Sequence, residues 1–339
     1  MADTLRTSRV VLGCMFSPRL SQAEIEHIVH AAHDAGITSF DTAPLYEFHR
    51  GEEQLGRALR GRWDRVQILT KAGLRWDGNH GRELFSFTDA RGERRVVRRD
   101  SRPASLREEV QASLVRLGCE TLDLLQLHQP DEDTPIADSI HALQALAREG
   151  LIRRFGVSNF SAPQLEAACD AGEVASLQSE YNLLQRWPEQ ELLPICVRRG
   201  VAFLAYSPLA KGVLAGHSRL RSPAERRSSR GSHYDDLVAR LALRPALGGA
   251  LDRLADASGH APSQLALAWL LAQPGVTAVV AGASSVAQVE ELARAAELKL
   301  TQADVDALSV AFARAGLLLK VADRVRSSPL GRVAQRVFG

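Results

Sequence analysis

The sequence has little excess charge and lacks long apolar runs. Its 339 residues carry a formal net charge of +2, with 24% charged and 45% hydrophobic residues. A nucleic-acid-binding domain normally shows a clear basic excess, so the charge argues against nucleic acid as a partner. The longest apolar runs, at 264–272 and 276–283, are far shorter than the roughly 20 residues that cross a bilayer. We therefore expect neither nucleic-acid binding nor a membrane segment.

Cysteine is also scarce. The four cysteines are scattered along the chain and form no CxxC pair. No N-terminal stretch combines a basic start, an apolar run and a small-residue cleavage site, which argues against secretion. Both features suit a reducing compartment, where free thiols serve as small core residues. The sequence therefore predicts a cytoplasmic protein.

What the chain does contain is a recurrent strand–helix pattern. Short apolar runs, each ending in a polar residue or glycine, alternate with segments of helical periodicity. Their continuous hydrophobicity is typical of strands that are buried on both faces. The predicted strands are Arg9–Gly13, Ile37–Asp41, Val66–Lys71, Leu122–His128, Arg154–Asn159, Ala175–Ser179, Val201–Tyr206 and Val276–Gly282.

Helix-start signals lie between these runs. Two S-x-x-E capping boxes, Ser21 with Glu24 and Ser105 with Glu108, each precede an apolar stripe at helical spacing. Ser161 is a third candidate cap, and Pro262 suits the first turn of a helix. Glycines then stand just before several of the next strands, as helix ends require.

Strict alternation of strands and helices gives either an open doubly wound sheet or a closed barrel. Two observations favour the barrel: there are eight units, and no G-x-G-x-x-G follows any strand. We predict an α/β fold, a (β/α)8 TIM barrel with large loops at its C-terminal face. A single domain is expected over 1–339, with its core at about 8–300 and a C-terminal helix and tail at 301–339.

Two insertions interrupt the regular spacing. Residues 74–103 are rich in arginine, and residues 209–235 are rich in Ser, Arg and Gly. Both follow strands, so both should lie over the barrel mouth that carries the site in such folds. The arginines of 91–102 and the basic tail at 319–339 could grip an anionic substrate, or they could be solvated surface charges.

Polar residues stand at the end of six of the predicted strands or one residue before it. In a barrel, the side chains at the strand ends converge on one mouth, and a packed barrel has little reason to place so many polar groups there. Lysine is rare in this chain, four of 42 basic residues, so a strand-end lysine is especially informative. The six are Asp41, Lys71, His128, Asn159, Gln178 and Tyr206.

These residue types suit carbonyl reduction. A tyrosine with an ordinary pKa near ~10 is a poor acid at neutral pH unless a cation stabilises its phenolate. Lys71 can supply that cation, and Asp41 can keep the lysine charged and oriented. Tyr46, five residues after Asp41, is the candidate acid, while His128 can hold the carbonyl oxygen or share the proton transfer.

Five motifs resemble those of the aldo-keto reductases. The segments 40–46 (FDTAPLY) and 51–56 (GEEQLG) are similar to the family's first signature, and 68–71 and 122–128 are similar to its lysine and histidine strands. The segment 156–160 (GVSNF) is close to its second signature. The resemblance extends from about Val10 to Leu298 and implies catalytic roles for Asp41, Tyr46, Lys71 and His128.

The same resemblance implies a nicotinamide cofactor along the mouth. Ser158, Asn159 and Gln178 would bind the carboxamide, and Tyr206 would stack on the ring. Residues 207–211 would meet the pyrophosphate, and residues 282–291 the adenosine phosphate. The full cofactor-binding set is Gly13, Met15, Asp41, Ser158, Asn159, Gln178, Tyr206, Ser207, Pro208, Leu209, Lys211, Gly282, Ser284, Gln288 and Glu291.

Two departures bear on the cofactor. Many relatives have Asn after the glutamate of the adenosine segment, where this chain has Leu292, and it has no Lys or Arg beside the expected phosphate. We expect NADP(H), with NAD(H) left open. The substrate would be a small-molecule carbonyl compound or alcohol, and the protein a monomer or homodimer.

Other interpretations stay open at this point. The chain could be a cofactor-sensing regulatory subunit resembling potassium-channel β subunits, with little turnover, or a non-redox barrel enzyme. No metal site is expected, because His27, His30 and His33 drift around their helix and lack the partners of the zinc patterns.

Overall fold

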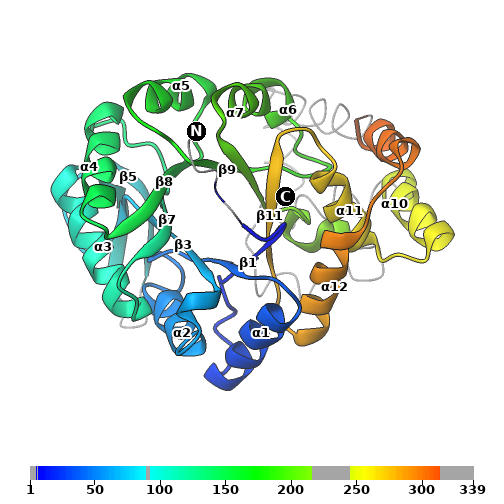
Figure 1. The fold of residues 1–339 in the computed structure, drawn as a ribbon, viewed down its shortest axis with the longest axis horizontal. Coiled ribbons are helices and arrows are strands. Elements are labelled where there is room, and N and C mark those ends of the chain that lie inside the picture. Colours follow the sequence, from blue (N-terminus) through cyan, green and yellow to red (C-terminus); the bar gives the residue numbers. More distant parts are fainter. Residues whose placement is uncertain (1–4, 6, 89–91, 216–244, 314–339) are drawn as a thin grey trace, which may run out of the picture.

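The computed structural model describes residues 5, 7–88, 92–215 and 245–313. Eight parallel strands close into a barrel in the order β1-β11-β10-β9-β8-β7-β3-β2 (Figure 1). They are β1 (Val10–Gly13), β2 (Ser39–Asp41), β3 (Gln67–Ala72), β7 (Leu122–Leu127), β8 (Ile152–Ser158), β9 (Ser176–Glu180), β10 (Ala202–Tyr206) and β11 (Val276–Gly282). The predicted (β/α)8 barrel is confirmed, and each strand ends within one residue of its predicted position.

Helices form an outer ring around these strands (Figure 1). They are α1 (Gln22–Asp34), α2 (Arg50–Ala58), α3 (Pro103–Leu117), α4 (Ile136–Arg148), α5 (Ala162–Ala171), α6 (Pro188–Glu191), α7 (Leu193–Arg199), α10 (Pro245–Ser258), α11 (Pro262–Leu271) and α12 (Val286–Glu297), with 3-10 helices η1 (Trp63–Arg65) and η2 (Ala210–Ala215). In the part of the chain that is described, no helix is long and apolar enough to cross a membrane.

The helix starts follow the capping signals with one exception. Ser21 accepts a hydrogen bond from the Glu24 amide, and the Glu24 carboxylate accepts one from the Ser21 amide, which completes the predicted box. Ser161 makes the same arrangement with Gln164. The prediction for Ser105 was wrong: α3 begins at Pro103, and Ser105 is buried in its first turn. Proline at the first helical position sets the backbone for the helix and so displaces the start.

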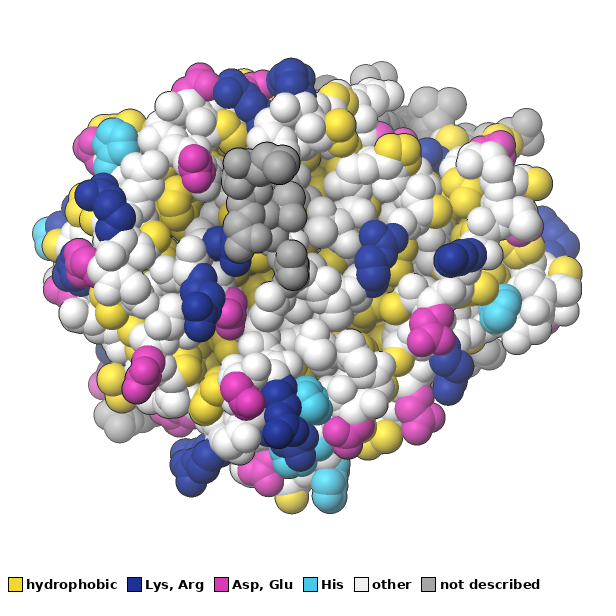
Figure 2. Space-filling view, in the orientation of Figure 1, with side chains coloured by type: hydrophobic (Ala, Val, Ile, Leu, Met, Phe, Trp, Pro, Cys, Tyr) yellow, Lys and Arg dark blue, Asp and Glu magenta, His cyan; other side chains and the backbone are white. Residues whose placement is uncertain are grey.

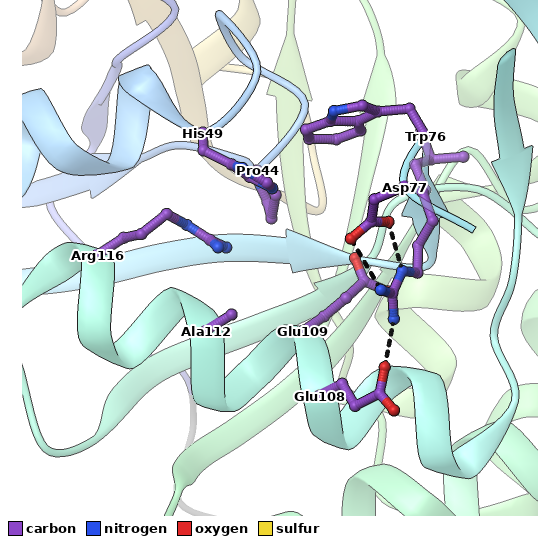
Figure 3. Close-up of a pocket in the computed structure, with 10 residues that line it drawn as sticks. Pro44, His49, Trp76, Asp77, Glu108, Glu109, Ala112 and Arg116 are labelled. Carbon is purple, nitrogen blue, oxygen red and sulfur yellow. Dashed lines mark hydrogen bonds and ion pairs between the residues drawn. The ribbon is translucent and has the colours of Figure 1, made fainter. Parts of the chain in front are cut away.

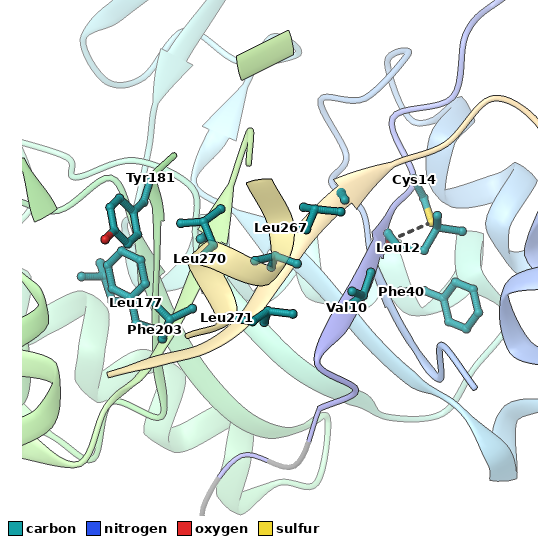
Figure 4. Packing of buried hydrophobic residues seen from close by; sticks show 14 of the residues in the cluster. Val10, Leu12, Cys14, Phe40, Leu177, Tyr181, Phe203, Leu267, Leu270 and Leu271 are labelled. Atoms are coloured by element: carbon teal, nitrogen blue, oxygen red, sulfur yellow. Dashed lines mark hydrogen bonds between the residues drawn. The ribbon is translucent and has the colours of Figure 1, made fainter. Parts of the chain in front are cut away.

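Apolar side chains fill two layers. The larger layer lies between strands and helices and includes Leu12 of β1, Phe40 of β2 and Leu267 of α11 (Figure 4). The smaller layer fills the barrel itself and includes Leu69 and Leu124. Burying each such side chain stabilises the fold by roughly 1.5–3 kcal/mol, so the barrel is a rigid, packed support for residues at its mouth.

The first insertion folds into a small sheet of its own. Strands β4 (Leu74–Arg75), β5 (Glu83–Thr88) and β6 (Arg94–Arg99) form a three-stranded sheet in the order β4-β6-β5, with antiparallel pairing. It directly follows β3, so it stands at the carboxyl ends of the barrel strands. The second insertion is described only as far as η2, and the tail at 319–339 lies outside the described residues.

The visible surface mixes both signs of charge. Figure 2 shows basic and acidic side chains interspersed over one face of the molecule, with apolar patches between them. This distribution agrees with the small net charge and gives that face no large single-sign field.

Candidate active site

The ends of β2 and β3 bring Asp41 and Lys71 together inside the mouth. The Lys71 Nζ donates hydrogen bonds to the Asp41 Oδ2 at 2.7 Å and to the Thr42 carbonyl at 3.0 Å. The two side chains are only 1% and 2% exposed. Because an isolated buried charge is very costly, this pair holds both charges in place.

Tyr46 lies in the turn after β2, beside the same lysine. The Lys71 Nζ donates to the Tyr46 hydroxyl at 3.3 Å and stands 5.1 Å from the centre of its ring. The predicted group of lysine, aspartate and tyrosine is therefore assembled in one place. A cation bonded to a phenol oxygen stabilises the phenolate that forms when the phenol gives up its proton.

Burial and charge set the protonation of this group. Burial raises the pKa of Tyr46 above its ordinary value, and the charge of Lys71 opposes that rise only in part. For Lys71, burial alone would lower the pKa, but Asp41 and Tyr46 outweigh it and the pKa is raised. At neutral pH the site thus holds a protonated phenol next to a charged lysine.

His128 follows β7 and faces Tyr46. The two rings meet edge to face, with centroids 6.1 Å apart. Burial, followed by the charge of Lys71, holds the pKa of His128 well below its usual value. The imidazole is therefore neutral at neutral pH, and a neutral imidazole offers one N–H donor and one acceptor.

The second oxygen of Asp41 leads to a buried amide chain. The Gln178 Nε2 donates to the Asp41 Oδ1 at 2.9 Å and to the Gln126 Oε1 at 3.0 Å, and the Gln126 amide donates to Ser176. Gln178 was expected to bind the cofactor carboxamide. In the structure its amide nitrogen holds Asp41, so its contact with the carboxamide stays a prediction. Gln126 is a supporting residue that the sequence did not reveal.

Asn159 and Tyr206 are hydrogen-bonded to each other at the ends of β8 and β10. The Tyr206 hydroxyl donates to the Asn159 Oδ1 at 2.8 Å, and the Asn159 amide donates to the His128 carbonyl and the Ser158 hydroxyl. Asn159 has a φ of 63°, a left-handed conformation that asparagine tolerates better than most residues. The Tyr206 ring is thereby held in one orientation at the mouth.

The expected phosphate segments lie at the ends of β10 and β11. Ser207 and Lys211 both have left-handed backbones, and Gly282 pairs in register with Gly13 across β11 and β1. Pro208 and Leu209 lie in the turn that connects β10 to η2. Ser285 caps α12 through the Gln288 amide, while the Gln288 side chain accepts from Ser284. Met15 is 68% exposed beyond β1.

Glu291, which was expected to bind the adenosine phosphate, is more buried than a surface ligand contact requires. Its carboxylate accepts a hydrogen bond from the Ser263 hydroxyl of α11, and the residue is 9% exposed. In this structure it joins α12 to α11, so its expected contact with the adenosine stays a prediction.

A second buried charge cluster stands behind Lys71. The fully buried Glu52 carboxylate accepts from the Thr70 hydroxyl at 2.7 Å, the Ser113 hydroxyl at 3.3 Å and the Arg116 Nε at 2.6 Å. Thr70 directly precedes Lys71, so the cluster ties β3 to α2 and α3. In the sequence Glu52 stands out only as part of the 51–56 motif, and no local pattern marks it as buried.

A cavity of about 170 Å³ opens outside the barrel, between the Tyr46 turn, β4 and α3 (Figure 3). Arg75 stands between Asp77 and Glu108, with bonds of 2.9 and 2.8 Å. The buried Glu109 accepts from the Gly73 amide at 2.9 Å, and burial raises its pKa to about 8. Leu74, three residues beyond Lys71, also lines the cavity.

The turn after Tyr46 carries a strained run and an aromatic cluster. Glu47, Phe48 and His49 have φ values of 49°, 52° and 78°, which non-glycine residues seldom adopt. Phe48 stacks on Phe87 of β5 with centroids 4.0 Å apart and meets Trp76 edge to face at 5.5 Å. These contacts hold the small sheet against the mouth.

Comparison with known proteins identifies the family. The sequence profile of the Aldo/keto reductase family matches residues 9–311. The chain belongs to this family. It is thus an oxidoreductase of a family that acts on carbonyl compounds and alcohols, and the resemblance of the motifs is confirmed.

Three proteins that this chain resembles differ in the substrates and cofactors that their names state. The NADH-specific methylglyoxal reductase of Escherichia coli (strain K12) is 34% identical over 279 residues, which cover 80% of this chain and 82% of that protein. The glycerol dehydrogenase AKR11B4 of Gluconobacter oxydans has a TM-score of 0.75 and 32% identity, covering 93% of this chain and 96% of its own. An aldo/keto reductase of Klebsiella pneumoniae, solved with NADP and acetate, has a TM-score of 0.68 and 26% identity, covering 92% and 96%.

Proposed function

We propose that this protein reduces an aldehyde or ketone to an alcohol with NADPH, or runs the reverse oxidation, with Tyr46 as the general acid and base. The observation that carries the proposal is the hydrogen-bonded group of Asp41, Lys71 and Tyr46, buried at one mouth of the barrel. The neighbouring His128 completes a site in which a carbonyl oxygen can meet two donors.

The residues at the mouth fit a nicotinamide dinucleotide. When bound, this cofactor supplies the hydride. Tyr206, fixed by Asn159, offers an aromatic face, and the α12 N-terminus, which has no acidic residue in its first turn, suits a phosphate. Relatives occur both with NADP and with NADH specificity. We propose NADP(H) for this chain.

The proton step follows from the charges. As negative charge develops on the carbonyl oxygen, the Tyr46 phenol donates its proton to that oxygen, and Lys71 stabilises the phenolate left behind. Asp41 keeps Lys71 protonated and aimed at the phenol, and Gln178 holds Asp41 in turn. The low-dielectric surroundings strengthen each of these interactions.

His128 has a different task. Its lowered pKa makes it neutral, so it does not compete with Tyr46 as a charged acid. Its N–H is suited to hold the carbonyl oxygen beside the phenol, since the two rings are in contact. This supports positioning of the substrate as its role.

The test is Tyr46→Phe. We expect turnover of NADPH with a panel of aldehydes to fall by about 10²–10⁴-fold, the contribution typical of general acid catalysis. Quenching of tryptophan fluorescence by NADPH should persist, since the phenol is not needed for cofactor binding. Tyr181→Phe, which removes another buried phenol hydroxyl, should keep its turnover. Normal turnover in Tyr46→Phe would refute the mechanism.

A further inference from the structure

Among the residues that the structure describes, none forms an ion pair with Arg99. Its Nε is buried but bonds to no acceptor, and no described carboxylate forms an ion pair with its guanidinium. A covered donor without an acceptor costs roughly 1–3 kcal/mol. Most arginines on this sheet differ: Arg75, Arg94 and Arg95 each pair with a nearby acid.

The register of the small sheet places Arg99 on its barrel-facing side. Arg99 is the antiparallel partner of Leu74, three residues after Lys71, and the next amide, Asp100, donates to the Gly73 carbonyl at 3.1 Å. Residues opposite each other in such a ladder share a face, and alternate residues of one strand do too. Arg99 therefore shares a face with Val97, which is fully buried.

The same face meets the turn that carries the catalytic tyrosine. Arg95, on that face of β6, is the partner of Phe87, and Phe87 stacks on Phe48, two residues after Tyr46. The side of the sheet that bears Arg99 thus looks onto the mouth of the barrel. Arg98 occupies the opposite side, as the partner of Arg75.

Asp100, the next residue, and Asp131, which bonds to the nearby Ser101, are already engaged. Asp100 accepts two bonds from Arg102, at 2.8 and 2.7 Å. Asp131 accepts from the Ser101 amide at 2.9 Å and from the Thr134 hydroxyl at 2.7 Å. The catalytic pair of Lys71 and Asp41 is neutral as a unit. Within the described part of the chain, the positive charge of Arg99 is therefore left without a paired acid.

We propose that Arg99 binds the anionic end of the substrate, which is an aldehyde or ketone that carries a carboxylate or phosphate. Because Nε is covered, the terminal nitrogens of the guanidinium are the donors left for a ligand, and they match two oxygens of such a group. The proposal rests on the proposed reductase function and adds the class of substrate.

The test compares kcat/KM for two aldehydes that differ only in charge, on variants of Arg99 and of the control residue Arg98. Para-carboxybenzaldehyde and its methyl ester share one aldehyde and differ in the charge. Arg99→Met should lower kcat/KM for the carboxylate by roughly tenfold to a hundredfold, mainly through KM, and change the ester by less than about twofold. Arg98→Met removes an arginine from the other face of the same strand and should leave both substrates unchanged.

A second measurement needs no variant. The wild-type enzyme should prefer the carboxylate over the ester, benzoate should compete with the aldehyde, and added salt should weaken both effects. Glyceraldehyde phosphate against glyceraldehyde gives the second arm. A larger Arg99-dependent gain for the phosphate identifies phosphate as the anion, and a larger gain for the carboxylate identifies carboxylate.

The outcomes separate this inference from the proposed function. If the ester is reduced but the carboxylate gains nothing from Arg99, the reductase function stands and the inference is overturned. Equal losses on both substrates in Arg99→Met would also overturn it, because they indicate a structural role. If no aldehyde of either kind is reduced, the proposed function itself fails.

Discussion

The catalytic cluster and the β4-β6-β5 sheet handle charge in opposite ways. In the cluster, Lys71 and Asp41 are almost wholly buried and bonded to each other, and Gln178 fixes the remaining Asp41 oxygen. On the sheet, several arginines pair with exposed acids, and Arg99 pairs with none of the described ones. The comparison teaches that the proposed proton transfer relies on an ion pair formed within the protein. Substrate selection, in contrast, can rely on a charge that has no partner among the described residues.

The largest effect is expected at the centre of the cluster. Lys71→Met should lower kcat for aldehyde reduction by about a thousandfold or more, because the phenolate of Tyr46 loses the cation that bonds to it. Steady-state NADPH oxidation measures this. Lys299→Met, an exposed lysine far along the chain, is the matched control. A loss below tenfold in Lys71→Met would show that the cluster does not control the proton.

The next largest effect is expected on stability, at the buried Glu52 cluster behind Lys71. Glu52→Gln should cost about 2–4 kcal/mol of unfolding free energy, since Arg116 and two hydroxyls lose a charged acceptor in a buried place. Urea unfolding followed by circular dichroism measures it. The control is Glu53→Gln, at the exposed neighbouring residue, for which we expect little change in the free energy of unfolding. Similar stabilities of the two variants would contradict the idea that this cluster anchors β3.

A smaller, pH-dependent effect is expected at Glu109. Its pKa is raised from 4.5 to about 8, so the folded state holds this proton more tightly than the unfolded chain. The associated stability is fully present below pH 4.5 and is lost as the pH rises toward about 8. Glu109→Gln should therefore gain about 1–2 kcal/mol relative to wild type between about pH 4.5 and about pH 6, and more as the pH approaches 8.

Unfolding midpoints measured across this pH range test the change. Glu108→Gln alters the adjacent carboxylate, which is exposed, and should show no such trend. If wild type and Glu109→Gln have parallel pH profiles, the buried carboxyl does not titrate as inferred.

The smallest effect is expected on the outer surface. Arg107 of α3 pairs with Glu149 just after α4, with bonds of 2.6 and 2.5 Å, yet both side chains are over 40% exposed. Exposed ion pairs contribute little because water and salt screen them. Arg107→Met should leave the thermal midpoint unchanged. A clear drop would mean that partnered surface charges matter here as much as buried ones.

Much of the barrel could be predicted because its strands are buried on both faces. Continuous apolar runs mark such strands, and the polar residues that end them mark the mouth, as Asp41 and Lys71 did. The capping boxes of Ser21 and Ser161 succeeded because they involve contacts three residues apart. Ser105 misled because Pro103 provides a stronger local start than a serine two residues later.

What could not be predicted depends on contacts between distant residues. The strand β6 reads RRVVRR, which lacks regular alternation, and becomes a strand only through its pairing with β4 and β5. The bond of Gln178 to Asp41 joins residues 137 positions apart. Glu52 and Glu109 owe their environment to α3, which no local pattern in α2 or β3 reveals.

The pairing of β1 with β11 also bears on how the protein is made. These strands meet in register, Val10 with Val279, although β11 is synthesised long after β1. The ring cannot close until β11 has left the ribosome, so during synthesis both β1 and β10 present unpaired backbone groups that other chains could join. A nascent chain of this protein should therefore depend on protection from chaperones until translation has passed β11.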